Sequence, residues 1–154
     1  MVLVSEECTT ILRSTTIVMH NLATWKEEQL FNWLKSQSFY SDLVFAKGQM
    51  SRWDCYAPGK KHRIELKCRR KHYDDILIEK SKYDALIAEA SKHGDVPVYI
   101  NSTPKGVYCF DLRKHDGFWE LRRMPKTTEF SQRQFIVKEV GYLNINDAFM
   151  LKVS

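Results

Sequence analysis

The sequence lacks any long apolar run. No stretch approaches the roughly 18 uninterrupted apolar residues that a membrane-spanning helix needs. The first 19 residues also lack the basic start, apolar middle and small-residue cleavage site of a secretion signal, and they include Glu6, Glu7 and Arg13. These two absences predict a cytoplasmic protein that has no membrane partner.

Cysteine is scarce and scattered along the chain. No pair among Cys8, Cys55, Cys68 and Cys109 has the spacing of a zinc site or a redox motif, so free thiols in a reducing compartment are expected. The chain also has no internal repeat, no low-complexity run and no linker. Its 154 residues therefore predict one domain, residues 1–154, that can bury a core without disulfides or a structural metal.

Positive charge is present in moderate excess and is concentrated in one segment. Lys and Arg outnumber Asp and Glu by 24 to 19, which gives a net charge of +5. Residues 60–71 contain seven of these cations and one acid, Glu65, and this density predicts a polyanionic partner. The alternative is an ordinary solvated strand face. The seven cations are Lys60, Lys61, Arg63, Lys67, Arg69, Arg70 and Lys71.

Hydrophobic spacing predicts two helices. The first is expected from Thr24, which can cap its N-terminus, to about Ser36. The second is expected over residues 76–92 and is closed by Gly94 as the C-cap. The apolar stripes consist of Trp25, Leu30, Phe31, Trp33 and Leu34 in the first helix, and of Tyr83, Leu86, Ile87 and Ala90 in the second.

A β-hairpin is predicted between the two helices. Residues 52–57 and 63–69 have strand character, and Pro58 and Gly59 between them suit a turn. Further strands are expected over 43–46, 96–100, 106–112 and 118–122, with a turn at 47–49. Residues 16–19 fit either a short strand or a helix. The order of helix, strands, helix, strands predicts an α/β (α+β) fold.

Three side chains of this hairpin suggest a reaction. Asp54 and Glu65 are expected on the same polar face of neighbouring strands, and Lys67 lies two residues beyond Glu65 on that face. Two carboxylates at this separation suit Mg²⁺ or Mn²⁺. Such a metal polarises a phosphodiester and activates water, while an adjacent lysine orients that water or stabilises the developing charge. The pattern predicts hydrolysis of a nucleic-acid backbone.

The chain resembles a known family in this region. The matching segments are Trp53-Asp54, Ile64-Glu65-Leu66-Lys67-Cys68-Arg69 and the predicted helix over residues 78–86. They resemble the PD-(D/E)XK nuclease superfamily, above all its small phage and archaeal members such as Holliday-junction resolvases and other structure-selective endonucleases. Trp53 stands where the family pattern has proline. The resemblance implies a restriction-endonuclease-like core with a central mixed β-sheet flanked by helices over about residues 24–123, and a C-terminal extension over 132–154.

The resemblance also implies roles for individual residues. Asp54, Glu65 and the carbonyl of Leu66 would hold Mg²⁺, for which Mn²⁺ would substitute, and Lys67 would serve the attacking water. The chain would then be a metal-dependent endonuclease acting on DNA, with RNA open as an alternative. A homodimer would supply a second active site. A phage-encoded protein would act in the host cytoplasm.

Two helical residues are further candidates that the resemblance suggests. Resolvase-like members add a glutamate from the first helix, and helical spacing selects Glu27 over Glu28 because Glu27 lies with the apolar stripe. On the second helix, Lys82 shares the face of the apolar stripe and is the preferred helper, with Glu79 behind it. The alternatives are ordinary first-turn acids for Glu27 and a plain surface ion pair for Lys82.

The cations of the basic segment are the expected nucleic-acid contacts. Arg69, Arg70 and Lys71 would clamp phosphates at the exit of the second hairpin strand, where His72 is an alternative general base. Lys60, Lys61 and Arg63 complete the predicted surface.

Two other functions compete with this interpretation. One is a catalytically silent nucleic-acid-binding or anti-defence module on the same fold, since a fold alone does not define a function. The other is an assembly protein that uses its basic face to bind a partner. The presence of all three residues, Asp54, Glu65 and Lys67, favours the enzyme.

Overall fold

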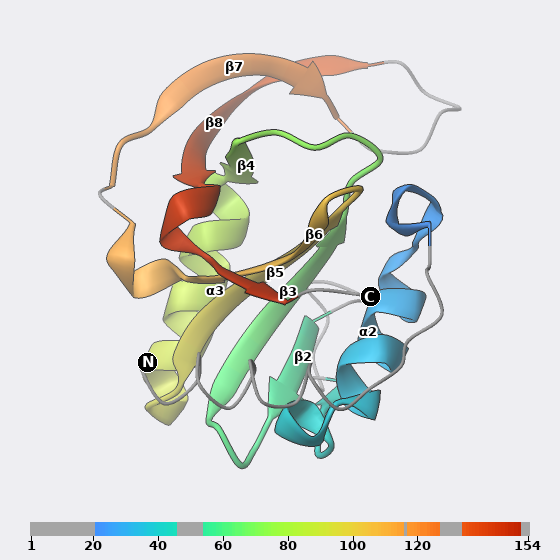
Figure 1. Ribbon diagram of the computed structural model, residues 1–154. Helices are drawn as coiled ribbons and strands as arrows, with labels where there is room; N and C mark the ends of the chain where they lie inside the picture. Colours follow the sequence, from blue (N-terminus) through green and yellow to red (C-terminus); the bar gives the residue numbers. More distant parts are fainter. Residues whose placement is uncertain (1–20, 46–53, 116, 127–133, 152–154) are drawn as a thin grey trace.

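The computed structural model describes residues 21–45, 54–115, 117–126 and 134–151 (Figure 1). The fold is α+β and forms a single domain, with two β-sheets and two α-helices among these residues. The structural expectations for residues 16–19 and 47–49 lie outside the described residues. The same is true of Trp53 and of the side chain of Asp54, whose backbone is described.

The main sheet is mixed and has six strands in the order β1-β2-β3-β5-β6-β9. β3 and β5 are parallel, and the other neighbours are antiparallel. The predicted hairpin is confirmed as β2 and β3, with its turn closed by a hydrogen bond of 3.2 Å from the Lys61 amide to the Pro58 carbonyl. The strands are β1 Val44–Phe45, β2 Asp54–Ala57, β3 His62–Cys68, β5 Val96–Thr103, β6 Gly106–Asp111 and β9 Phe149–Leu151.

A second, three-stranded sheet has the order β4-β8-β7. Its strands are β4 Asp75–Glu79, β7 Glu120–Pro125 and β8 Phe135–Asn144. The prediction that the second helix begins at Ile76 is wrong, because residues 75–79 pair with β8, and Ile76 and Ile78 bury their side chains through this pairing. Branched side chains at alternate positions suit a strand. The strand expected over 118–122 begins later, at Glu120, and continues to Pro125.

Two helices pack against the main sheet. α2 spans Glu27–Ser36 and α3 spans Lys80–His93. The predicted Thr24 cap is wrong: Lys26 is the N-cap, and its amide donates to Gln29 Oε1 at 2.7 Å. The predicted C-cap of α3 is confirmed, because Gly94 has a φ of 67°, a left-handed conformation that glycine adopts without strain. The described residues also form four short 3₁₀ turns: η1 Leu22–Thr24, η2 Ser38–Tyr40, η3 Leu112–Lys114 and η4 Ile145–Asp147.

The main sheet separates two hydrophobic cores. On one face α2 packs over Ile64, Leu66 and Ile100. On the other face, α3 and the second sheet enclose a core of Ile76, Ile78, Tyr99, Tyr108, Phe110, Leu112 and Leu143. The C-terminal segment contributes to both cores, through Leu151 on β9 and Leu143 on β8. α2 and α3 therefore lie on opposite faces of the sheet that carries the predicted catalytic residues.

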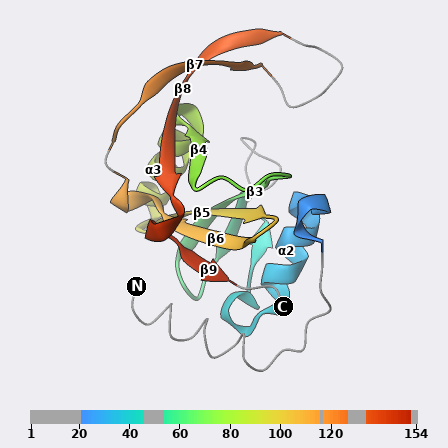
Figure 2. The same cartoon turned by 45° about the horizontal axis from the view of Figure 1, so that its top comes forward.

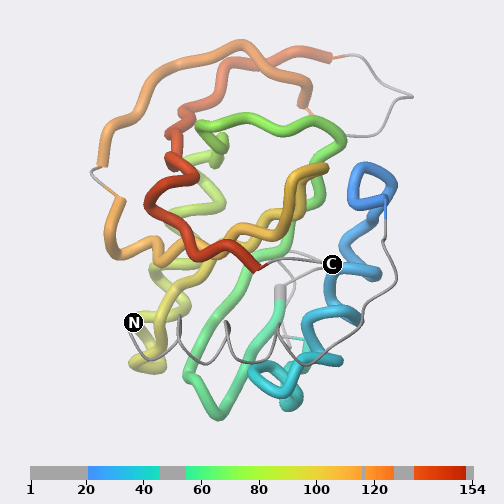
Figure 3. The backbone as a smooth tube through the Cα atoms, in the orientation of Figure 1, coloured from blue at the N-terminus to red at the C-terminus, as the bar shows by residue number. Residues whose placement is uncertain are grey.

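The β7 and β8 strands extend beyond the second sheet. β4 pairs only with residues 140–144 of β8, whereas residues 135–139 pair only with β7. The backbone tube shows this outer part arching away from the main sheet (Figure 3), and the turned view shows the same arrangement (Figure 2).

Candidate active site

β3 presents its charged residues on the face of the main sheet that α3 covers. Ile64 and Leu66 are buried in the core beneath α2, while Arg63, Glu65 and Lys67 alternate with them and are half-buried. The alternation follows from the period of two in a strand. It places Glu65 and Lys67 on one face, as the sequence predicts.

Asp54 and Glu65 are direct partners in the antiparallel pairing of β2 with β3. Directly opposite residues in such a pair have their Cα atoms about 4.5–5.5 Å apart. The predicted adjacency of these two positions is therefore confirmed in the backbone register. Lys67 lies two residues along β3 from Glu65, opposite Asn101 of β5.

Lys82 approaches Glu65 from the first turn of α3. Its Nζ lies 3.7 Å from Glu65 Oε1, and the side chains are 43% and 14% exposed, respectively. The structure thus brings Lys82 to the candidate site. Glu79, which was expected behind Lys82 on the same helix face, instead ends β4 and accepts a hydrogen bond of 3.0 Å from Lys138. This difference arises because residue 79 belongs to a strand.

Glu27 points inward, as the helical spacing predicts, whereas Glu28 is exposed. Its Oε1 accepts a hydrogen bond of 3.4 Å from the Cys68 amide at the end of β3. However, α2 covers the face of the sheet opposite to Glu65 and Lys67. Glu27 therefore lies beside the end of β3 rather than on the face that carries Glu65.

Arg69 links the two sheets. Its guanidinium donates to Asn101 Oδ1 at 2.8 Å, to the Tyr99 hydroxyl at 3.1 Å and to the Leu77 carbonyl at 2.6 Å. These acceptors belong to β5 and β4. Arg69 was predicted to clamp phosphate, but three protein acceptors already hold the guanidinium, so its geometry supports a structural role.

The predicted basic surface is divided between two ends of β3. Lys60 and Lys61 flank the hairpin turn, whereas Arg70 and Lys71 follow the other end of the strand. The six residue steps from His62 to Cys68 correspond to about 20 Å. Besides Arg69, two further cations of the set contact protein groups: Lys60 Nζ lies 4.2 Å from the Phe39 ring centroid, and Arg63 Nε donates to Asp95 Oδ2 at 2.8 Å. The basic segment therefore does not form one continuous patch.

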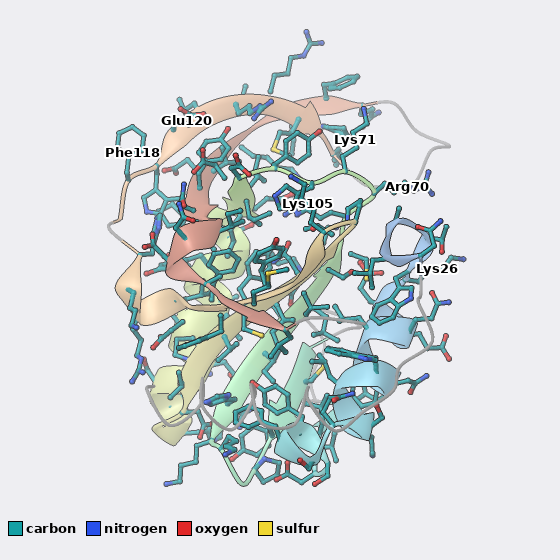
Figure 4. The ribbon with its side chains drawn as sticks, in the orientation of Figure 1. Lys26, Arg70, Lys71, Lys105, Phe118 and Glu120 are labelled. Atoms are coloured by element: carbon teal, nitrogen blue, oxygen red, sulfur yellow. The ribbon has the colours of Figure 1, made fainter. Side chains whose placement is uncertain are left out.

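Four exposed cations gather where β3 and β5 end, a region called here the basic edge: Lys26, Arg70, Lys71 and Lys105 (Figure 4). Cys68 pairs with Ser102 at the ends of these parallel strands, and the Cys68 amide contacts Glu27 at the start of α2. Sequence reasoning missed Lys26 and Lys105, because only the tertiary arrangement brings them beside residues 70–71. Lys67 lies one residue before the end of β3, next to this edge.

His72 is held by neighbouring residues. Its Nδ1 lies 2.9 Å from Thr103 Oγ1 and its Nε2 lies 3.2 Å from Asp74 Oδ1. Thr103, the partner of Nδ1, is fully buried. Because both ring nitrogens have partners, His72 is better placed to fix the β5–β6 turn than to act as a general base.

The donor set of the candidate site suits a hard divalent cation. Carboxylates, a backbone carbonyl and water are the ligands that Mg²⁺ prefers. Asp54 and Glu65 supply two carboxylates on paired strands, and Leu66 contributes a carbonyl next to Glu65. Among the side chains that the structure describes, which exclude that of Asp54, no group of three or more His, Cys, Asp or Glu is arranged to hold a metal. Two carboxylates and one carbonyl fill only part of the octahedral coordination of Mg²⁺, so they would leave positions for water and phosphate.

Comparisons with protein-family models, with curated proteins and with solved structures find no match. No helix in the described part of the chain is both long enough and apolar enough to cross a membrane.

Proposed function

We propose that this chain is a Mg²⁺-dependent endonuclease that hydrolyses phosphodiester bonds of DNA. The observation that carries the proposal is the direct pairing of Asp54 with Glu65, with Lys67 two residues further along the same strand. On this proposal, the main sheet with α2 and α3 corresponds to a restriction-endonuclease-like core. A homodimer in the cytoplasm, or in the host cytoplasm for a phage protein, would place two sites on one duplex.

Each residue of the site has a distinct proposed role. Asp54, Glu65 and the Leu66 carbonyl would hold Mg²⁺, with Mn²⁺ as a substitute. The bound cation would supply Lewis-acid chemistry toward the phosphate and acidify a water molecule. Lys67 would donate hydrogen bonds that orient the attacking water and stabilise the negative charge that develops on the phosphate. Lys82, at 3.7 Å from Glu65, would limit charge repulsion around the carboxylates.

The basic edge supports a polyanionic substrate. Lys26, Arg70, Lys71 and Lys105 are exposed beside the end of the strand that carries Lys67. Cations arranged in this way bind phosphates by electrostatic attraction, independently of base sequence. Such binding would deliver a phosphodiester to Glu65 and Lys67. It would serve RNA as well as DNA, so both belong in the test.

The test is cleavage of labelled duplex, single-stranded and branched DNA, and of RNA, by wild type and Lys67→Ala with Mg²⁺, Mn²⁺ or EDTA. Lys92→Ala is the matched control, because Lys92 is an exposed lysine at the far end of α3. The expected result is metal-dependent cutting that is lost in Lys67→Ala and retained in the control. Binding without cutting under every metal would refute the proposal and favour a silent nucleic-acid-binding module.

A further inference from the structure

The outer part of the β7–β8 hairpin exposes apolar side chains to solvent. This part, residues 120–126 with 134–139, is called here the ribbon arm. Leu121, Val137 and Phe135 are 74%, 64% and 51% exposed. The register, in which Leu121 faces Glu139 and Arg123 faces Val137, places these three side chains on the same face of the ribbon. They form an apolar strip that is not covered by the rest of the described structure.

Within the described part of the chain, the ribbon arm has only two strands where this strip lies. Residues 135–139 pair with β7 but not with β4. A two-stranded ribbon is marginally stable in water, and exposed apolar side chains add to the cost of leaving it uncovered. The sequence nevertheless places Leu121, Phe135 and Val137 there, which points to a binding surface.

The ribbon arm also carries an excess of positive charge. Its cations are Arg122, Arg123, Lys126 and Lys138, against two acids, Glu120 and Glu139. The Arg123 guanidinium lies 5.2 Å from the centroid of the Phe135 ring, so charge and apolar surface occur together. The arm arches over the end of the molecule where β3 and β5 finish (Figures 1 and 2), which is the end that carries the basic edge.

We propose that the ribbon arm binds duplex DNA, with the two strands in a groove and with Arg123 and Lys126 on phosphates. This inference rests on the proposed function, to which it adds a duplex substrate. A two-stranded β-ribbon fits the major groove, about 12 Å wide, and the apolar strip would contact base edges there. Pairing the exposed edge of β7 with a second copy in the two-fold antiparallel register centred on residues 122–123 is less favourable, because it sets arginine against arginine.

The test measures binding of a labelled duplex in EDTA, where cleavage does not interfere, over a range of salt concentrations. The arm variant is Arg123→Ala/Lys126→Ala. Its matched control is Lys35→Ala/Lys92→Ala, which removes two cations from the last turns of α2 and α3, away from the arm (Figure 1). The arm variant is expected to bind on the order of tenfold more weakly. The slope of log affinity against log salt concentration, called here the salt slope, should fall in magnitude by about 2, close to 0.9 for each phosphate that is no longer neutralised. The control should bind like wild type.

A second variant, Leu121→Ser/Val137→Ser, tests the apolar strip. It should weaken duplex binding and leave the salt slope unchanged, because it removes no charge. Sedimentation of wild type and of this variant tests the alternative that a second copy of the chain binds the ribbon arm. If the substitutions convert a dimer to a monomer without changing duplex binding, the ribbon arm is a self-association surface and the proposal is wrong.

Other results separate this inference from the proposed function. Unchanged binding by the arm variant, or single-stranded DNA that binds as tightly as duplex, overturns the ribbon arm proposal even if the wild type cleaves. Conversely, if the wild type binds duplex through the arm and yet fails to cut DNA with any of the metals tested, that result supports the ribbon arm proposal and refutes the nuclease proposal. Circular dichroism of each variant distinguishes a folded protein that binds DNA weakly from one that has unfolded.

Discussion

At the scale of single residues, His62 couples stability to pH. It is 7% exposed beneath η2, and its Nδ1 lies 2.8 Å from the Tyr40 hydroxyl. Burial, with the nearby positive charge of Lys60 as the next cause, lowers the pKa of His62 from 6.5 to about 4. Between these pH values the unfolded chain binds more protons than the native protein, so stability is fully present above pH 6.5 and is lost as the pH falls toward 4.

The pKa difference of His62 corresponds to a loss of at most about 3 kcal/mol. Urea denaturation at pH 7 and pH 4.5 should show this loss in wild type, and His62→Gln should reduce it because glutamine does not titrate. His93→Gln, which changes an exposed histidine, should keep the wild-type pH dependence. An equal pH dependence of stability in wild type and His62→Gln would contradict the assignment of this effect to His62.

Lys82 is expected to matter for activity more than for stability. Its side chain is 43% exposed and its ammonium lies 3.7 Å from Glu65, so solvent screens the ion pair and its contribution to folding is below about 1 kcal/mol. Lys82→Ala should therefore keep the urea midpoint of wild type while cleavage by the proposed nuclease falls about tenfold, as expected for loss of a supporting electrostatic group. A large loss of stability with unchanged cleavage would assign Lys82 a purely structural role.

At the scale of elements, Arg69 holds two sheets together. Its three acceptors include the side chain of Asn101, which is fully buried, and the Leu77 carbonyl on β4. Removing the guanidinium takes a donor from each of these acceptors, one of which is the buried Asn101 side chain, so Arg69→Ala should lower the free energy of unfolding by about 2–4 kcal/mol. Lysine cannot reproduce the planar fork, so Arg69→Lys should also destabilise.

The matched control for Arg69 is Arg70→Ala. Arg70 is exposed on the basic edge, and a surface substitution of this kind changes the free energy of unfolding by within about 0.5 kcal/mol. Urea denaturation, analysed with a common m-value, measures the free energy of unfolding of both variants. Equal stabilities for the two alanine variants would show that Arg69 does not join the sheets.

Local patterns predicted the elements whose periodicity was unambiguous. Alternating side chains from Arg63 to Cys68, beside the Pro58–Gly59 turn, were enough to predict β2 and β3 and the adjacency of Asp54 and Glu65. Ile76, Leu77 and Ile78 fit either a helix or a strand, and only their pairing with β8, more than 60 residues later, decides between the two. The role of Arg69 depends likewise on acceptors in β4 and β5, which its own segment does not reveal.

At the scale of the whole molecule, the tertiary arrangement determines the position of segments and side chains that the sequence pattern could not place. The residues after 132 gave only short apolar pieces, yet β8 pairs with β4, and β9 forms an edge of the main sheet beside β6. Lys26 and Lys105 join the basic edge only because α2 and the β5–β6 turn meet at the end of β3. Long-range pairing therefore builds both the second sheet and the substrate-binding surface proposed here.

The two cores share β5 and β6, so they should unfold together. Ile100 packs in the core beneath α2, whereas Phe110 packs in the core beneath α3, and each is almost fully buried. Ile100→Ala and Phe110→Ala should each lower the free energy of unfolding by about 2–5 kcal/mol. Because the shared strands couple the cores, each substitution should lower the midpoint of one common transition.

Tryptophans report on each core separately. Trp33 packs in the first core, Trp25 packs against it, and Trp119 packs against the second core. A Trp25→Phe/Trp33→Phe/Trp53→Phe background therefore keeps only Trp119, and a Trp25→Phe/Trp53→Phe/Trp119→Phe background keeps only Trp33. In both backgrounds the fluorescence transition should coincide with the loss of far-ultraviolet circular dichroism, with and without Ile100→Ala or Phe110→Ala. Separate midpoints, with Ile100→Ala moving only the Trp33 signal, would mean that the second sheet and α3 unfold independently. The hydrogen bonds by which Arg69 joins β5 of the main sheet to β4 of the second sheet argue for the common transition.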